Sequence, residues 1–575
     1  MRVADHIAAS LAKRGVTRVF EMTGGMITFL LDAMYLHGGI EITSLHHEQA
    51  AAFAAEGWAR MAGIPGVALA TSGPGATNLL TGVASCWFDS TPAVFITGQV
   101  NRAELRGERP VRQIGFQETD IVAMARPVVK VAHLVQDPAA VPGDMCDAFE
   151  IALAGRPGPV LLDVPMDVQR AETGAVVAPC TSAPAAGPAA AEVRAALDIL
   201  RSAARPLLLA GAGVRIGDAT ADLRAFARAT GVPVVTSLPG LDAIAFDDPL
   251  RVGMIGTYGN RWANLALGDA DAVLVIGSRL DLRQTSARVA EFVEGKRIVQ
   301  VDIDAGEIGT PVPVEAGIAA DAGAFLRAAL SAWGADPPLP LDDWRRDIDA
   351  LRGVWPDVAE LAALPGINPN VVMHELSRAP RAASAFVADV GQNQMWAGQS
   401  LEIGEDQRFM TSAGLGSMGF ALPAALGAAL AVRDRAGRAS SVTGPVVCIT
   451  GDGGLQVNLQ ELESVVRLGA PVKIVVLDNR CLGMVRQFQD DLFDSRRQST
   501  EWGYGAPDFV ALAAAFGLPA ESVSDPSQVV GAVDRLMADP GSPALLRVEI
   551  TGESSVSPKV AFGRSVADMD PPVGT

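Results

Sequence analysis

Two short apolar runs near residue 450, each followed by an oxygen-bearing side chain, constrain most strongly what this chain can fold into. The first run leads into the Gly-Asp-Gly-Gly sequence at 451–454, and the second leads into Asp478 and Asn479. Both runs are β-branched and of strand length, and the residues between them have the apolar spacing of a helix. The stretch from 446 to 479 therefore predicts a strand–helix–strand unit of a parallel sheet.

The loops that follow neighbouring strands of such a sheet lie at its carboxyl edge, where ligands bind. The carboxylate of Asp452, the amide oxygen of Asn479 and a main-chain carbonyl such as that of Cys481 would suit Mg²⁺. This cation takes few protein ligands and completes its shell with phosphate oxygens and water. Gly451 and Gly453 would let backbone N–H groups approach a phosphate. Taken alone, a Gly-Asp-Gly turn is more often only structural.

The composition narrows the classes of partner. The 575 residues carry 46 basic and 65 acidic side chains, a net charge of −19, and no basic cluster interrupts them. Nucleic acid and anionic membrane surfaces are therefore not expected as partners. The five cysteines show no paired spacing, which predicts neither a zinc site nor a disulfide framework. With no signal peptide and no segment of about 20 apolar residues, the chain is predicted to be cytoplasmic.

The length predicts about three or four domains. Strands and helices alternate from the N-terminus onward, which predicts parallel sheets with both faces covered. The predicted fold class is α/β, with three doubly wound parallel-sheet domains, linkers rich in small residues and proline, and a surface loop at 433–444. The predicted boundaries are 1–170 for the first domain, 171–191 for a linker, 192–335 for the middle domain, 336–366 for a second linker, 367–550 for the third domain and 551–575 for a mobile tail or lid.

Several long motifs together carry a family resemblance. They include Ser-Leu-His-His-Glu-Gln-Ala-Ala at 44–51 and Ala-Thr-Ser-Gly-Pro-Gly-Ala-Thr-Asn-Leu at 70–79. The 27 positions from Asp452 to Asn479 match the metal–diphosphate motif of thiamine-diphosphate enzymes. The chain resembles the acetolactate synthases (acetohydroxyacid synthases) of that group, collinearly from residue 1 to about 550. Further matching stretches are 97–100, 115–120, 155–160, 389–396 and 411–420.

The resemblance implies catalytic roles in the first domain, which would bind the pyrimidine ring of thiamine diphosphate. Glu48 would hydrogen-bond the pyrimidine N1′, and Gly25 and Gln117 would face the substrate. The Gly416 carbonyl would accept from the 4′-amino group, and Met418 would be the apolar wedge that bends the cofactor. Without this context, the helix dipole explains a carboxylate such as Glu48 in a first helical turn, and core packing explains Met418.

The resemblance also implies the residues that hold the diphosphate and the metal. Mg²⁺ would bind Asp452, Asn479 and the Cys481 carbonyl. In this family the catalytic glutamate and the diphosphate site come from different subunits, so a homodimer or homotetramer is expected. The other residues implied for thiamine diphosphate in the third domain are Gly391, Gln392, Asn393, Gly451, Gly453, Gly454 and Met484.

The middle domain resembles the FAD-binding domain of the synthases, in which the flavin is structural. Gly-Ala-Gly after a strand, as at 211–213, is weak evidence by itself. Related enzymes keep this domain with an adenine nucleotide or with nothing bound, and these alternatives stay open. The residues implied for FAD are Gly211, Gly213, Gly256, Arg279, Asp281, Arg283, Asp302 and Asp321.

The chain departs from the synthases where the second substrate would bind. Met26 stands where they usually have Ala, Phe488 where they have Trp, Met166 where they have Lys, and Leu282 where they have Asp. Arg283, which in the family lies where an acceptor carboxylate can be paired, is retained. The predicted acceptor pocket consists of Met26, Phe116, Arg283 and Phe488.

The predicted function is that of a carboligase, which decarboxylates pyruvate and transfers the two-carbon acetyl unit to a second carbonyl, as in acetolactate formation. One alternative is transfer to a ketone or a nucleotide-linked keto-sugar, because residues 557–565 resemble the tails of synthase relatives in deoxysugar pathways. Others are a simple 2-keto acid decarboxylase, an oxalyl-CoA decarboxylase relative and a catalytically silent paralogue.

Overall fold

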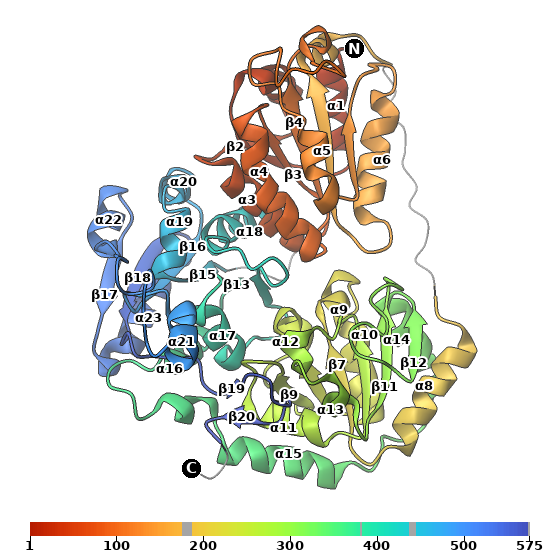
Figure 1. The fold of residues 1–575 in the computed structure, drawn as a ribbon, viewed down its shortest axis with the longest axis vertical. Coiled ribbons are helices and arrows are strands. Elements are labelled where there is room, and N and C mark those ends of the chain that lie inside the picture. Colours follow the sequence, from red (N-terminus) through yellow and green to blue (C-terminus); the bar gives the residue numbers. More distant parts are fainter. Residues whose placement is uncertain (175–186, 380–381, 436–443, 573–575) are drawn as a thin grey trace.

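Three six-stranded parallel sheets, each covered by helices on both faces, form three lobes (Figure 1). This computed structural model confirms the predicted α/β class with three doubly wound domains. Near-continuous apolar runs are typical of strands that are buried on both faces, and β7 (Pro206–Ala210) and β10 (Ala272–Ile276) are buried at every residue. The structure describes residues 1–174, 187–379, 382–435 and 444–572.

In the first domain the strands are ordered β2-β1-β3-β4-β6-β5. The order reverses between β1 and β3, and such a switch point opens a crevice at the carboxyl edge of a sheet. The strands are β1 (Arg18–Met22), β2 (Glu41–Ser44), β3 (Gly66–Ala70), β4 (Ala93–Gln99), β5 (Val131–Leu134) and β6 (Pro159–Pro165). The helices are α1 (Val3–Lys13), η1 (Gly25–Ile27), α2 (Thr28–His37), α3 (Glu48–Ala62), α4 (Pro74–Phe88), η2 (Arg102–Glu104), α5 (Ile121–Ala125), η3 (Arg126–Val128), α6 (Val141–Leu153) and α7 (Met166–Arg170).

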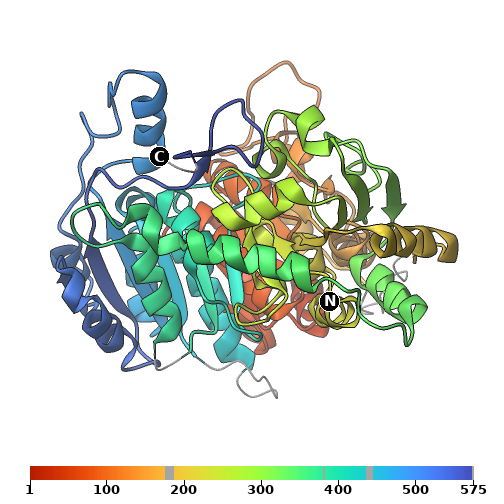
Figure 2. The ribbon, with the colours of Figure 1, turned by 90° about the horizontal axis from the view of Figure 1, so that it is seen from below.

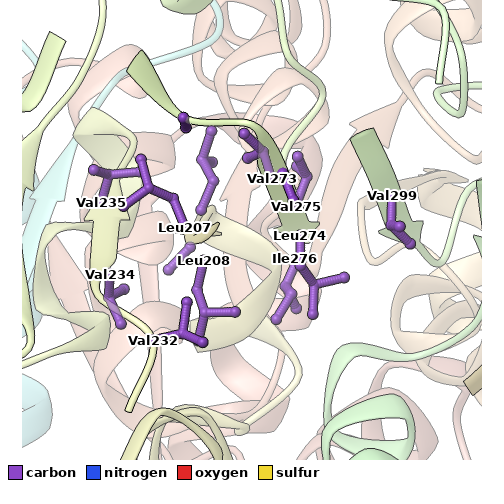
Figure 3. Packing of buried hydrophobic residues seen from close by; sticks show 14 of the residues in the cluster. Leu207, Leu208, Val232, Val234, Val235, Val273, Leu274, Val275, Ile276 and Val299 are labelled. Carbon is purple, nitrogen blue, oxygen red and sulfur yellow. The ribbon is translucent and has the colours of Figure 1, made fainter. Parts of the chain in front are cut away.

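In the middle domain the order is β12-β11-β10-β7-β8-β9, with the switch point between β7 and β10. Aliphatic side chains of β7, β8 and β10 pack together in its core (Figure 3). The other strands are β8 (Val234–Thr236), β9 (Arg251–Met254), β11 (Arg297–Asp302) and β12 (Ala316–Ala319). The helices are α8 (Ala190–Ser202), α9 (Ala212–Ile216), α10 (Thr220–Thr230), η4 (Leu238–Ala243), α11 (Arg261–Asp269), α12 (Leu282–Thr285), α13 (Val289–Val293) and α14 (Ala322–Trp333).

The third domain repeats the pattern of the first, with the order β14-β13-β15-β16-β18-β17 and the switch point between β13 and β15. The strands are β13 (Ala385–Ala388), β14 (Arg408–Thr411), β15 (Val446–Gly451), β16 (Val472–Asp478), β17 (Ala520–Val523) and β18 (Ala544–Glu549). The helices are α16 (Pro369–Arg378), α17 (Gln392–Ser400), α18 (Ala421–Arg435), α19 (Asp452–Val457), α20 (Glu461–Arg467), α21 (Gly483–Leu492), α22 (Phe509–Ala515), η6 (Pro526–Gln528) and α23 (Val529–Met537).

Helices α3 and α18 join the first and third domains at very close range. A Cβ at Gly57 would lie 2.0 Å from the Ala424 carbonyl oxygen, and one at Gly427 would lie 1.9 Å from that of Ala54. Only glycine fits at these two positions, since real Cβ atoms do not approach carbonyl oxygens so closely. The crossing therefore fixes the two domains against each other through backbone contact.

The second predicted linker is not irregular. It contains α15 (Asp342–Val354) and η5 (Asp357–Leu361), and α15 buries Trp344 and Ile348 in the core of the middle domain. Seen from below, α15 runs across the face of the molecule (Figure 2). Three other predictions fall at least partly on residues that the structure does not describe, namely 175–186 of the first linker, 436–443 of the surface loop and 573–575 of the tail.

The segment predicted as a mobile tail or lid packs against the middle domain. Its strands β19 (Lys559–Val560) and β20 (Met569–Asp570) form an antiparallel pair. The Val560 N–H donates to the Thr257 carbonyl over 2.7 Å, and the side chains of Val566 and Met569 are buried in the middle-domain core.

The described residues bear on two predictions, one about disulfides and one about membrane-spanning segments. Cys86, Cys448 and Cys481 are free and buried, whereas Cys146 is disulfide-bonded, a bond that the scattered cysteine spacing did not indicate. None of the helices in the described ranges has both the length and the apolar character that a membrane crossing requires.

Candidate active site

At the switch point of the third sheet, glycine-rich loops follow β13 and β15. Gly391, with φ 154°, precedes α17, and Gly451 precedes α19. The Asn393 side chain is buried and donates to the Asp389 carbonyl over 2.8 Å. Backbone N–H groups in such loops are available to an anion, because the first turn of a helix leaves them without intrahelical partners.

The three residues predicted to bind Mg²⁺ lie around this edge. Asn479 Oδ1 accepts from the Cys481 N–H over 3.2 Å, and Asn479 Nδ2 donates to Gln392 Oε1 over 3.0 Å. Asp452 is 2% exposed, and its Oδ2 has no hydrogen-bond partner among the described residues. Burial, followed by the neighbouring charge of Asp478, raises the pKa of Asp452 to about 7.

A divalent cation fits this arrangement. A buried carboxylate oxygen without a partner is costly, and a metal ion would supply the missing partner. The space beside the neighbouring Gly453 is narrow, since a Cβ there would lie 2.5 Å from Leu482 Cδ2 and 3.3 Å from Met418 Cε. The described residues hold no group of three His, Cys, Asp or Glu side chains suited to a metal. A metal ion at this edge would therefore need amide, main-chain and phosphate oxygens as further ligands.

Asp389 begins the matching stretch at 389–396, and the sequence alone does not indicate what its side chain does. Its carboxylate accepts from the N–H groups of Gly419 at 2.9 Å and Ala421 at 3.0 Å. Burial raises its pKa to about 6. Asp389 thereby ties the end of β13 to the start of α18. The signal that could have revealed it is its position directly after a strand, as for Asp452.

Glu48 is the first residue of α3 and lies at the carboxyl edge of the first sheet. The preceding His47 caps the helix, with its Nδ1 accepting from the Gln49 N–H over 3.0 Å. The Glu48 side chain is 8% exposed and accepts from Asn78 Nδ2 on α4 over 3.0 Å. A Cβ at Gly75 would lie 3.2 Å from Glu48 Oε1. The carboxylate is thus held between the starts of two helices.

The loop after β1 carries Gly25 and Met26 and lies against the loop after β3. A Cβ at Gly24 would lie 2.5 Å from Thr71, whereas the position of a Cβ at Gly25 is open. The Met26 N–H donates to Thr71 Oγ1 over 3.2 Å, and the Met26 carbonyl accepts from Gln169 Nε2 over 2.8 Å. The backbone of this loop is fixed, and Gly25 leaves free space beside it.

Gln117 lies against the loop after β3, at the same edge. Its backbone has φ 66°, in the left-handed region, and a Cβ at Gly73 would lie 2.9 Å from Gln117 Cβ. Its neighbour Phe116 is 79% exposed. Within one chain, Phe116 therefore does not line an enclosed pocket.

The residues predicted to bind FAD also share a carboxyl edge. A Cβ at Gly211 would lie 2.1 Å from the Gly277 carbonyl oxygen, so the loops after β7 and β10 touch at the switch point. Asp302 ends β11, and Asp321 caps α14 after β12. Of the others, Gly213 lies against Gly277, Gly256 lies against the Arg283 carbonyl, and Arg279 faces Asp281 at 3.6 Å.

The structure brings some predicted groups together and leaves others apart. Asp452, Asn479 and Gln392 (the Asp452 cluster) lie at the same edge of the third sheet, where Asn479 is hydrogen-bonded to Gln392. No hydrogen bond within the described residues joins Glu48 to these three. Met484 packs at the third-domain core, while Met418 is 36% exposed. The four predicted acceptor residues, Met26, Phe116, Arg283 and Phe488, come from all three domains.

Comparisons with known proteins place all three parts of the chain in one family. Residues 1–124, 193–329 and 389–548 match the N-terminal TPP binding domain, the central domain and the C-terminal TPP binding domain of thiamine pyrophosphate enzymes. The acetolactate synthase isozyme 2 large subunit of Escherichia coli is 38% identical over 99% of this chain and 99% of its own length. The chain belongs to the acetolactate synthase family of thiamine pyrophosphate enzymes.

Other members of the acetolactate synthase family have about the same sequence identity to this chain. The acetolactate synthase large subunit of Parasynechococcus marenigrum is 36% identical over 97% of this chain and 89% of its own length. The probable acetolactate synthase 2, chloroplastic, of Oryza sativa is 36% identical over 98% of this chain and 85% of its own length. The family predicted from the motifs is therefore confirmed, and thiamine diphosphate, Mg²⁺ and FAD are the cofactors typical of it.

Proposed function

We propose that the chain decarboxylates pyruvate with thiamine diphosphate and Mg²⁺ and transfers the resulting acetyl unit to a second carbonyl, as an acetolactate synthase does. The observation that carries this proposal is the buried Asp452 carboxylate, whose Oδ2 has no hydrogen-bond partner among the described residues, at the same edge of the third sheet as Asn479. A metal-bound diphosphate at this edge would satisfy both groups.

Each protein group has a role that its position supports. When bound, thiamine diphosphate supplies a nucleophilic carbon and an electron sink for decarboxylation. Asp452, Asn479 and the Cys481 carbonyl hold the metal, and the loops at 391–393 and 451–454 hold the diphosphate. Glu48 holds a proton toward a ring nitrogen, and the contact with Asn78 fixes its carboxylate. Gly25 leaves space for substrate beside the loop that carries it.

We further propose that two copies of the chain complete the site. Within one chain Glu48 and the Asp452 cluster share no hydrogen bond among the described residues, and Phe116 is 79% exposed. Pairing with a second copy would cover Phe116 and bring a Glu48 to each diphosphate site. The middle domain would hold FAD at the edge formed by Gly211, Gly277 and Asp302.

A second candidate is acetyl transfer to a ketone or a keto-sugar. Met26 and Phe488 are the residues that favour it, since the synthases usually have Ala and Trp at these positions. The Phe488 side chain is 46% exposed on α21, where it can contact a ligand.

Product analysis tests both candidates. Purified enzyme is incubated with pyruvate, thiamine diphosphate, Mg²⁺ and FAD, first alone and then with a ketone acceptor. Rapid acetolactate formation without the ketone supports the first candidate. Slow acetolactate with fast formation of a tertiary alcohol supports the second. If no CO₂ is released from any 2-keto acid, the chain is not a decarboxylating enzyme.

A further inference from the structure

Residues 411–418 comprise the last residue of β14 and most of the loop that leads to α18, and they include two residues assigned to the cofactor. Gly416 lies in the left-handed region with φ 75°, and Met418 is 36% exposed. Met418 Cε lies 3.3 Å from the position that a Cβ on Gly453 would occupy, so the loop contacts the diphosphate edge. The placement of this loop therefore affects the shape of the site.

The C-terminal end of α4, in the first domain, supports this loop. Asp89 Oδ1 accepts from the Gly414 N–H over 2.7 Å, and both Asp89 oxygens lie 3.2 Å from the Ala413 nitrogen. Gly414 has no room for a side chain, because a Cβ there would lie 2.7 Å from Phe88 Cβ. Asp89 and Phe88 thus fix the loop by charge-assisted hydrogen bonds and by steric contact.

Arg60, on α3, holds both Asp89 and the start of the loop. Its Nη1 donates to the Thr411 carbonyl over 3.0 Å, and its Nη2 lies 3.2 Å from Asp89 Oδ2. The same guanidinium pairs with Glu56 one turn earlier and lies 5.6 Å from the centre of the Phe420 ring. Arg60 therefore contacts the chain on both sides of the loop.

The two domains also meet outside this cluster, because α3 and α18 are in backbone contact. Burial raises the pKa of Asp89 and raises the pKa of Glu56 to about 7, so the cluster carries a desolvation cost. A costly ionic cluster that contacts a ligand-binding loop is well placed to fix its geometry. The helix that ends at Asp89 also carries Asn78, which contacts Glu48.

We propose that Arg60 and Asp89 are positioning residues, which hold the loop at 411–418 so that Gly416 and Met418 lie where thiamine diphosphate binds. Neither side chain is proposed to touch the cofactor or the substrate. The inference rests on the proposed function, since it concerns the binding of that cofactor.

The test compares two buried carboxylates, each of which forms hydrogen bonds between the first and third domains. Asp89→Asn removes the charge that holds the loop. Asp434→Asn is the matched control, because Asp434 pairs with Arg18 of β1 over 2.9 and 2.8 Å and does not contact the loop. Both side chains are largely buried, at 6% and 15% exposure. The dissociation constant for thiamine diphosphate is measured by calorimetry with saturating Mg²⁺, beside the thermal unfolding of each variant without cofactor.

Asp89→Asn is expected to raise the dissociation constant about tenfold or more, because it weakens several charge-assisted hydrogen bonds. Asp434→Asn should leave the dissociation constant for thiamine diphosphate unchanged, while lowering the unfolding temperature about as much as Asp89→Asn does. Should Asp89→Asn fail to fold, Arg60→Lys and Gly414→Ala displace the same loop and should also weaken binding. Unchanged binding in the folded loop variants, or equal weakening in Asp434→Asn, would overturn the inference. A wild-type chain that binds no thiamine diphosphate would instead refute the proposed function.

Discussion

The first and third sheets have the same strand order and the same switch point, yet their carboxyl edges differ in chemistry. At the third edge Asp389, Asp452 and Asp478 each end or directly follow a strand, and all three are buried. At the first edge the loops after β1 and β3 carry no acid beyond the strand ends, and Glu48 is the carboxylate that begins α3.

The difference shows that topology places a site and that the side chains at the strand ends decide what it can hold. An edge with several buried acids suits a metal-bound diphosphate. An edge of glycines with one carboxylate suits a neutral ring that exchanges a proton. The middle sheet adds a third case, in which Gly211 and Gly277 touch at a switch point of a different strand order.

The largest effect is expected for Glu48→Gln, which keeps the hydrogen bond to Asn78 but removes the ionisable carboxyl. If the first edge acts in proton transfer, release of CO₂ from pyruvate should fall by about 10²- to 10⁴-fold, with thiamine diphosphate still bound. The control is Glu21→Gln, at a buried carboxyl on β1 that contacts Ser44. Near-normal turnover in Glu48→Gln would remove the assigned role.

Asp452→Asn should give a different pattern. Activity should fall with the loss of metal-dependent cofactor binding, but the chain without cofactor should be at least as stable as the wild type. The reason is that the substitution removes a buried charge whose Oδ2 lacks a partner among the described residues. Thermal unfolding with and without Mg²⁺ and thiamine diphosphate measures both effects. A strongly destabilised variant without cofactor would mean that Asp452 is held for the fold.

The strand ends that form the carboxyl edges of the sheets can be predicted from the sequence where neighbouring residues mark them. The strands Pro206–Ala210 and Arg297–Asp302 are easy to recognise, because each is an apolar run that ends abruptly at glycine or aspartate. The first strand, Arg18–Met22, is harder to delimit from the sequence, since the buried Glu21 interrupts its apolar pattern. Helix α15 was missed because prolines surround it and few apolar residues mark its buried face.

The residue types of the site were predictable, but their supports were not. Asp452 and Asn479 follow apolar strands and are recognisable by type and spacing. Asp89 contacts Gly414 across 325 positions of sequence, and Arg60 contacts Thr411 across 351. No local pattern marks such pairs, because their meeting depends on how the two domains pack through α3 and α18.

An ionic cluster held for structure should behave oppositely to Asp452, and His374 with its two carboxylate partners provides this test. Asp357 Oδ2 lies 2.8 Å from His374 Nε2, and His374 Nδ1 lies 2.8 Å from Glu402 Oε1. Burial alone would lower the pKa of His374, but the hydrogen bonds and charges of Asp357 and Glu402 raise it above 6.5 overall. The protonated ring therefore stabilises the fold below about pH 6.5, and this contribution is lost as the pH rises through the raised pKa.

We expect His374→Gln to lower the free energy of unfolding by about 1–2 kcal/mol at pH 6, with a smaller difference at pH 9. Chemical denaturation across this range measures it. His133→Gln is the control, because His133 faces Asp144 at 3.6 Å with 46% of its side chain exposed and should contribute little. A difference for His374→Gln that does not shrink as the pH rises would contradict the ionic account.

The smallest expected effect tests whether the two edges meet in the working enzyme. Met26 lies at the first edge and Phe488 on α21 of the third domain, and they are proposed to face the same acceptor. Met26→Ala and Phe488→Trp should each change the ratio of ketone product to acetolactate by about tenfold or less.

If both residues contact one acceptor, the double variant should depart from additivity by at least about 0.5 kcal/mol. Leu492→Trp, at a similarly exposed position on α21, should be additive with Met26→Ala. Additive effects for Met26 and Phe488 would mean that the edges act on separate ligands, and the shared strand order would then reflect only a common architecture.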